Sequence, residues 1–183
     1  MYHCGAQFLI DHWTALPGAA SIPARVRFEP MRFGARTAAL FLADHNQEAG
    51  RLRLAGGLVE QLHGRYLTGA AWASAWREDS RAELTEAVRE AFRQARPMVI
   101  TARAPGLNGL IQIAIAPLRG PSGAADRFVG LYQPLDPEDR SAKSVGPFTL
   151  VQSEIVAIEQ AGAKRRPALS RASLNGRLIE PAD

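Results

Sequence analysis

The sequence predicts an α+β domain in which helices cover one face of a five-stranded antiparallel sheet, with an amphipathic helix before the domain and a basic tail after it. Two strand-like runs precede one long amphipathic helix, and three strand-like runs follow it. Short, turn-rich segments join successive strands, which favours antiparallel neighbours because a parallel pair needs a crossover of a dozen or more residues. The 183 residues, 46% hydrophobic and 22% charged, suit one domain of ordinary size with extensions.

Residues 6–16 (AQFLIDHWTAL) predict an N-terminal helix that ends at the following Pro-Gly pair. One side of this helix carries large apolar side chains, which either the sheet of the same domain or a second copy of the chain must cover. The sequence leaves both arrangements open. Residues 19–36, which include several prolines and arginines, are expected to wrap around the domain, so the first segment is 1–36. The candidate dimer or partner surface consists of Phe8, Leu9, Trp13 and Leu16.

A hairpin comes next, with strands predicted over 38–45 and 51–56. Gly56 and Gly57 then end the second strand, and they allow two interpretations, a phosphate-binding loop or a hinge. A Walker loop requires Gly-x-x-x-x-Gly-Lys-Ser/Thr, and this stretch has neither the lysine nor the hydroxyl residue. The sequence therefore favours a hinge, where a side chain would clash as the strand turns into a helix.

Helical segments are expected between this hairpin and the next strand. Residues 58–64 and 65–76 predict short helical pieces. The clearest helix is 80–95, because Ser80 and Glu83 have the spacing of a capping box and a proline follows two residues after its end. Its apolar side repeats every four residues, at Leu84, Val88 and Phe92.

Three further strands are predicted over 98–103, 110–118 and 127–132, separated by segments rich in glycine, proline and aspartate. With the hairpin they form the core domain, 37–135. The remainder, 136–183, is expected to be largely flexible, although 148–158 could add one amphipathic element.

Four stretches, in order, resemble the motifs of a bacterial PAS-like family found mainly in proteobacteria, and the order of elements is that of PAS domains. The resemblance covers roughly residues 6 to 135. Two positions depart from the family pattern: Gln112 stands where an acidic residue is usual, and Gly57 replaces a small hydroxyl residue. The matching stretches are FLIDHW (8–13) with PAR (23–25), RLRLAG (51–56) with HGRYLTG (63–69), RP (96–97), and QIAIAPL (112–118).

The resemblance implies a pocket between the sheet and the helices, which in PAS domains holds haem, flavin, a small acid or nothing. The lining expected here is apolar with few polar groups, so the sequence predicts a small apolar ligand or none. A flavin photoreceptor needs a reactive cysteine beside the pocket, and the single cysteine, Cys4, lies outside the domain. The expected lining residues are Leu58, Leu62, Trp72, Trp76, Ile100, Ile113 and Ile115.

Haem binding is the main cofactor alternative. It requires an axial ligand that faces the pocket, and His63 is the histidine expected to lie near it. A histidine beside a glycine is more often a capping or surface residue. No pair of histidines has metal-ligand spacing, so no metal site is predicted.

The sequence predicts no enzyme. Neither Gly-x-Ser-x-Gly nor His-Glu-x-x-His occurs, and the carboxylates of residues 78–90 fit the solvated face of the long helix. The resemblance implies a stand-alone regulatory protein in bacterial signal transduction. A cytoplasmic location is expected because no apolar run approaches the roughly 20 residues of a membrane span and the single cysteine suits a reducing compartment. By resemblance, its expected partners are histidine kinases, other two-component proteins and further PAS domains, and it could form a homodimer.

The basic tail supplies a last alternative, binding to nucleic acid or to an anionic membrane surface. From Gln160 onward the chain has five basic and two acidic residues, which is a net charge of +3 out of the formal +4. The body is therefore almost neutral. Because no aromatic residues interleave these cations, a solvated tail is the favoured interpretation.

Overall fold

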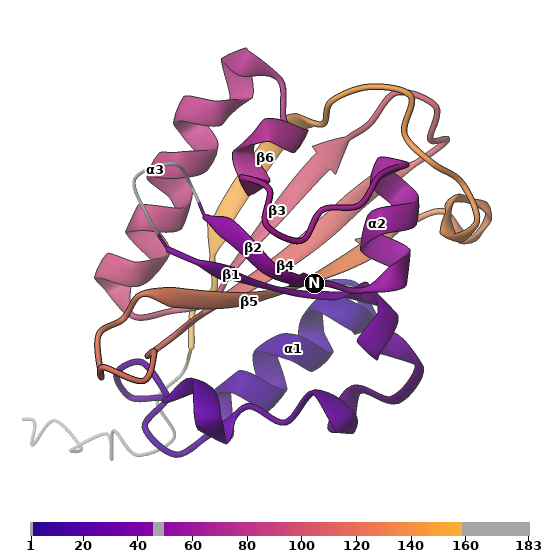
Figure 1. Cartoon of the computed structure of the whole chain (residues 1–183). Coiled ribbons are helices and arrows are strands. Elements are labelled where there is room, and N and C mark those ends of the chain that lie inside the picture. The colour runs from indigo at the N-terminus through magenta and orange to yellow at the C-terminus, as the bar shows by residue number, and fades with distance from the viewer. Residues whose placement is uncertain (1, 46–49, 159–183) are drawn as a thin grey trace, which may run out of the picture.

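The computed structural model has one six-stranded antiparallel sheet at its centre, with helices on both faces (Figure 1). The structure describes residues 2–45 and 50–158. The strand order is β2-β1-β5-β4-β3-β6, and every neighbouring pair runs antiparallel. The strands are β1 (Leu40–Asp44), β2 (Arg51–Ala55), β3 (Met98–Arg103), β4 (Leu110–Leu118), β5 (Arg127–Pro134) and β6 (Thr149–Ile155).

Helices α2 and α3 lie over one face of the sheet, and α1 lies over the other (Figure 1). Each face has its own apolar core, one beneath α2 and α3 and one beneath α1. Within the described residues, no helix combines the length and apolar character that crossing a membrane requires. The α-helices are α1 (Cys4–Thr14), α2 (Gly57–His63) and α3 (Glu78–Gln94), and the 3₁₀ helices are η1 (Arg25–Arg27), η2 (Pro30–Ala39), η3 (Trp72–Ala75) and η4 (Pro137–Arg140).

The predicted N-terminal helix, α1, packs on the face of the sheet opposite α2 and α3. Leu9 and Trp13 are fully buried against β4 and β5 of the same chain. The Trp13 indole Nε1 donates a hydrogen bond of 2.7 Å to the carbonyl of Pro117, which fixes the helix on the sheet. Phe8 and Leu16 are half-buried around this contact. Of the two arrangements left open, the structure has the apolar side of α1 covered by its own sheet.

Strand β6 is the sixth strand that the sequence analysis did not count. It pairs with β3, from Arg103 opposite Thr149 to Met98 opposite Ile155, and so covers an edge that a five-stranded sheet would leave open. The extension predicted to be largely flexible therefore contains η4 and β6. The basic tail, residues 159–183, lies outside the described residues.

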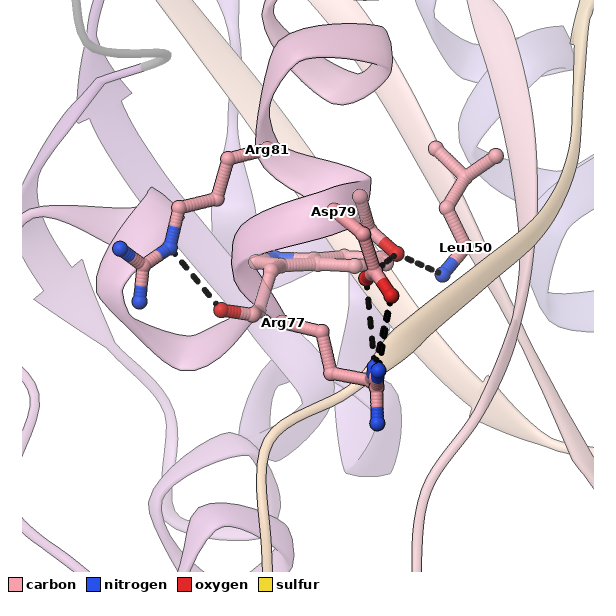
Figure 2. Close-up of polar contacts among 6 residues, drawn as sticks. Arg77, Asp79, Arg81 and Leu150 are labelled. Atoms are coloured by element: carbon pink, nitrogen blue, oxygen red, sulfur yellow. Dashed lines mark hydrogen bonds and ion pairs between the residues drawn. The ribbon is translucent and has the colours of Figure 1, made fainter.

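The start of α3 differs from the predicted capping box. The helix begins at Glu78, so Ser80 lies within the first turn rather than before it. The Ser80 hydroxyl instead accepts a hydrogen bond of 3.1 Å from the Leu150 backbone N–H of β6, while Arg77 pairs with Asp79 (Figure 2). Ser80 therefore does not cap α3 as predicted but makes a tertiary contact with β6.

The two adjacent glycines have different surroundings. A Cβ on Gly56 would lie 2.3 Å from the Ala38 carbonyl oxygen and 2.9 Å from that of Thr37. A Cβ on Gly57, the first residue of α2, would meet nothing within 4 Å. The hinge interpretation is therefore confirmed at Gly56, where the chain passes too close to neighbouring backbone for any side chain, and it does not apply to Gly57.

Candidate functional site

The seven residues predicted to line a pocket lie on the face of the sheet covered by α2 and α3. The structure brings six of them together as fully buried neighbours in one core, and Leu58 is partly buried beside them. They pack against one another in this core, and Trp76 also lines a surface cleft with Arg77 and Pro147. The six are Leu62, Trp72, Trp76, Ile100, Ile113 and Ile115.

Aromatic rings fill the centre of this core. Phe41 lies with its ring centroid 5.3 Å from that of Trp72, 5.5 Å from that of Tyr132 and 5.9 Å from that of Phe128. Trp72 and Trp76 meet edge to face at 5.5 Å. Such contacts are the normal packing of aromatic residues in a closed interior. Aromatic side chains from β1, β5 and η3 therefore pack together between the helices and the sheet.

A short chain of hydrogen bonds crosses this core from helix to sheet. The Trp72 indole Nε1 donates to the Tyr132 hydroxyl over 2.9 Å, and the same hydroxyl lies 3.0 Å from His63 Nε2. Because an indole N–H can only donate, the Tyr132 oxygen is the acceptor from Trp72, and its O–H can donate to the imidazole. We call His63, Trp72 and Tyr132 the buried triad. It satisfies three polar groups that would each be costly to bury alone.

Burial shifts the pKa values of two members of the buried triad. Desolvation, with a smaller effect from the Arg65 charge, lowers the pKa of His63 to about 4, so the imidazole is neutral at pH 7. Complete burial raises the pKa of the Tyr132 hydroxyl above its usual value, although the hydrogen bond from Trp72 opposes this shift. The triad is therefore an uncharged network under ordinary conditions.

These contacts do not fit His63 as a haem ligand. Its Nε2 is bound to Tyr132, and its ring stacks on Phe148 with centroids 4.4 Å apart. A haem iron on Nε2 would break the bond to Tyr132, and the porphyrin would need the space that the aromatic core fills. His63 is a half-buried residue that packs on Phe148 at the rim of a surface cleft. Within residues 2–45 and 50–158, no group of three or more His, Cys, Asp or Glu side chains could hold a metal ion.

We expect His63 to make the stability of the protein depend on pH. Because the folded-state pKa of about 4 lies below the ordinary 6.5, the unfolded chain binds a proton more readily. The contribution of the neutral imidazole is complete above pH 6.5 and is lost progressively as the pH falls from 6.5 to 4. Its size is about 2 kcal/mol, after allowance for solvent screening at the rim of the cleft.

Urea unfolding at pH 7 and pH 4.5 measures this effect. In His63→Gln, a non-titrating amide replaces the imidazole, so the variant should lose less stability than the wild type between the two pH values. The contributions of His12 and His45 to the pH dependence are the same in both proteins and cancel in the comparison, although burial also lowers the pKa values of these histidines. Equal losses in the two proteins would show that His63 is not held neutral by the fold.

A cleft of about 570 Å³ opens beside the buried triad, between the C-terminal end of α2, the start of α3 and the segment 143–147. Backbone hydrogen bonds hold this segment across the end of the core: the N–H of Ser144 donates to Leu62 O over 2.6 Å, and that of Val145 to Pro105 O over 2.9 Å. We call residues 143–147 the strap and this opening the strap cleft. Its lining consists of His63, Gly64, Arg65, Ser74, Ala75, Arg81 and the strap.

The sequence analysis missed Tyr132 and the strap. Tyr132 has the strand alternation of Phe128 and Gly130, which places its side chain on the face beneath α2 and α3, and this periodicity could have identified it. The strap lies in a stretch that looks like a linker (DRSAKSVG), and no local signal marks it. Its position depends on Leu62 and Pro105, which are far away in the sequence.

Comparison with known protein families identifies the family of this chain. The model of the PAS domain family matches residues 1–133, more than two thirds of the chain. No curated protein matches the chain at a significant level.

Gln112, which departs from the family pattern, accepts a hydrogen bond of 2.9 Å from the His3 backbone N–H and so helps to hold the N-terminal segment.

The solved structures to which the chain is similar include LOV proteins, all of low identity and with TM-scores below 0.5. A variant of RsLOV, 24% identical, aligns over 62% of this chain and 69% of its own with a TM-score of 0.46. The Rhodobacter sphaeroides LOV protein is 20% identical over 56% of this chain and 66% of its own, with a TM-score of 0.42. The dark structure of the blue-light photoreceptor Aureochrome1 LOV is 12% identical and aligns over 62% of this chain and 87% of its own, with a TM-score of 0.46.

The sheet of five successive antiparallel strands, the helices packed on one of its faces and the family match over residues 1–133 agree with one another. Helix α1 lies within the matched residues, whereas the sixth strand, β6, lies beyond them. The chain belongs to the PAS domain family.

Proposed function

We propose that this PAS domain is a non-enzymatic regulatory module that acts through protein–protein contacts in bacterial signal transduction. The observation that carries the proposal is the filled interior between the helices and the sheet. The resemblance places the ligand pocket of a PAS domain between the helices and the sheet, and in this interior Trp72, Phe41 and Tyr132 pack against one another. A signal that does not enter the core must act on the surface, so binding of a partner is the event that this fold is suited to transmit.

Histidine kinases and other two-component proteins are the proposed partners, with further PAS domains as a related class. Family membership supports this choice. In the proposed mechanism, the domain has two arrangements of its helices on the sheet, and a partner that binds one arrangement more tightly shifts the population toward it. The buried triad connects α2, η3 and β5, so a movement of α2 would be transmitted to the sheet.

The chemistry of the described residues supports a function without catalysis. A histidine with a pKa of about 4 is a weak general base near pH 7, and the thiol of Cys4 is exposed at the start of α1, on the opposite face of the sheet. The alternative of a basic tail that binds nucleic acid or a membrane depends on residues 164–177. These residues lie outside the described residues, so the alternative stays a prediction.

Kinase autophosphorylation assays test the proposal. Each histidine kinase encoded by the source organism is incubated with radiolabelled ATP in the presence and absence of the purified protein. We expect the initial rate to change at least about three-fold for one or a few kinases and to stay constant for the others. A PAS domain of unrelated sequence at equal concentration is the control. Constant rates for every kinase would contradict the proposed partners.

A further inference from the structure

The strap cleft has a strongly basic lining. Arg65 comes from the residue after the C-cap of α2, Arg81 from the first turns of α3, and Lys143 from the strap. The stem of Lys143 passes over Gly64, where a Cβ would lie 3.6 Å from the lysine Cδ. No Asp or Glu side chain is among the residues that line the cleft. Three segments far apart in the sequence thus bring three positive charges to one concave surface.

These charges differ from those of the neighbouring arginines on α3. Arg77 pairs with Asp79, Arg89 with Glu86, and Arg93 with Glu90. By contrast, Arg65, Arg81 and Lys143 form no ion pair with any residue that the structure describes. Paired charges on a helix surface attract a ligand weakly, whereas unpaired charges of one sign in a concavity attract an anion.

A hydrogen bond to the backbone holds the Arg81 side chain beside the strap cleft. Its Nε donates a hydrogen bond of 3.0 Å to the Trp76 carbonyl oxygen, and its two terminal nitrogens point away from the Asp79 carboxylate (Figure 2). Arg65 is similarly tied, with one terminal nitrogen 3.2 Å from the Ser74 hydroxyl. Each guanidinium keeps N–H donors that these bonds do not use, and guanidinium groups bind phosphate and carboxylate with two parallel hydrogen bonds.

A buried donor without an acceptor lies in the adjoining wall. Trp76 is fully buried, and its indole Nε1 has no hydrogen-bond partner within the described part of the chain. Trp76 lines a second cleft, which shares Arg81 and Pro147 with the strap cleft and is also lined by Arg77, Glu78 and Asp79. Buried indole N–H groups normally find an acceptor, and Trp76 lies next to the strap cleft without one.

We propose that the strap cleft binds a small dianion, a ligand that carries a phosphate group or two carboxylates, through Arg65, Arg81 and Lys143. The strap cleft is concave, and its volume of about 570 Å³ lies within the range of small-molecule sites. Both properties favour a small ligand over a nucleic acid strand. His63 at the rim would couple the bound anion to the buried triad, because its ring contacts both the cleft and Tyr132. The site goes beyond the proposed partner and does not depend on it.

Titration with two probes tests the site. Inorganic phosphate and succinate are added separately to the purified protein at constant ionic strength, and the indole N–H resonances of the three tryptophans are followed by ¹⁵N NMR. We expect saturable shifts of Trp72 and Trp76 below about 10 mM of at least one probe. Trp13 lies on the opposite face of the sheet, so its resonance should stay constant. Tighter binding of phosphate would indicate a ligand with a phosphate group, and tighter binding of succinate would indicate a ligand with two carboxylates.

Charge-removing variants locate the binding. Lys143→Gln and Arg81→Gln should each weaken binding roughly ten-fold or more, because each removes a charge-assisted hydrogen bond. Arg89→Gln is the matched control on α3, since it removes an exposed arginine outside the cleft and should leave affinity unchanged. Lys143 is exposed and makes no ion pair with a described residue, so its variant is expected to unfold at the wild-type temperature even if Arg81→Gln does not.

Two results would overturn the inference. One is the absence of saturable shifts with both probes. The other is equal affinity of the wild type and Lys143→Gln, which would place any binding elsewhere on the chain. Neither result depends on a kinase, so failure of this site and failure of the proposed partner can be told apart.

Discussion

Replacing Trp13 with alanine is expected to lower the free energy of unfolding by about 4 kcal/mol, which corresponds to a fall in melting temperature of roughly 10 °C. The indole is fully buried between α1 and the sheet, and it is hydrogen-bonded to the Pro117 carbonyl. The alanine variant would leave a large cavity and an unsatisfied carbonyl at the same point. Denaturant unfolding followed by circular dichroism measures the loss.

Thr14→Ala is the matched control for Trp13→Ala. Thr14 is on the same helix and exposed, and its hydroxyl bonds only to the Ile10 carbonyl one turn back. Its replacement should change stability by less than about 0.5 kcal/mol. If Trp13→Ala were as mild as Thr14→Ala, α1 would not be packed on its own sheet in solution, and its apolar side would be free to meet a second copy.

Replacing Gly56 with alanine is expected to destabilise the protein by about 3 kcal/mol, at the upper end of the range for overpacked sites. The new methyl group would overlap the backbone at Thr37 and Ala38, which cannot rotate away as a side chain could. The Gly56 N–H also donates to the Leu40 carbonyl over 2.8 Å, so a shift of the hinge would strain the end of β1. The melting temperature and the urea midpoint both report the effect.

Gly57→Ala tests the same chemistry one residue further on. The site is open, and its backbone is the ordinary helical start of α2. Alanine there should be neutral or should stabilise by about 0.5 kcal/mol, because it reduces the freedom of the unfolded chain. Comparing the two variants shows whether the close approach to backbone at Gly56, or the loss of any glycine, causes the destabilisation. Similar changes in stability at both positions would mean that Gly56 does not approach the backbone of η2 closely.

The filled core changes how a PAS fold can respond to a signal. With Trp72 and Phe41 in contact across the helix–sheet interface, a ligand cannot push helix and sheet apart without first displacing an aromatic ring. The strap cleft offers a different entry point, at the rim, where His63 is reached from the surface. A dianion bound there would favour protonated His63 and so would act on the bond to Tyr132.

Local patterns in the sequence were sufficient for most elements. The strands 98–103 and 110–118 were predicted with their observed bounds, because each is a run of apolar residues between clear turn signals. The long helix was predicted within two residues at its start, and the error came from Ser80. A serine three residues before a glutamate is a good cap in isolation, but the hydroxyl of Ser80 binds β6 instead.

Other features could not be predicted from local patterns. Strand β6 alternates weakly, with no side chain fully buried, and only its pairing with β3 defines it as a strand. Six of the seven residues predicted to line a pocket lie in one core, and their role as a ligand lining stays a prediction. Whether they surround a space or fill it depends on the rings of Phe41 and Phe128, which come from strands distant in the sequence.

The sequence by itself determined the order of most elements and the apolar face of each helix, because periodicity and turn chemistry act over a few residues, and its motifs resembled one family. The tertiary structure decided what covers α1, which of two glycines is required, and where His63 meets Tyr132. Each of these outcomes is a contact between segments separated by tens of residues. No short-range pattern encodes such contacts, since they exist only after the chain has packed against itself.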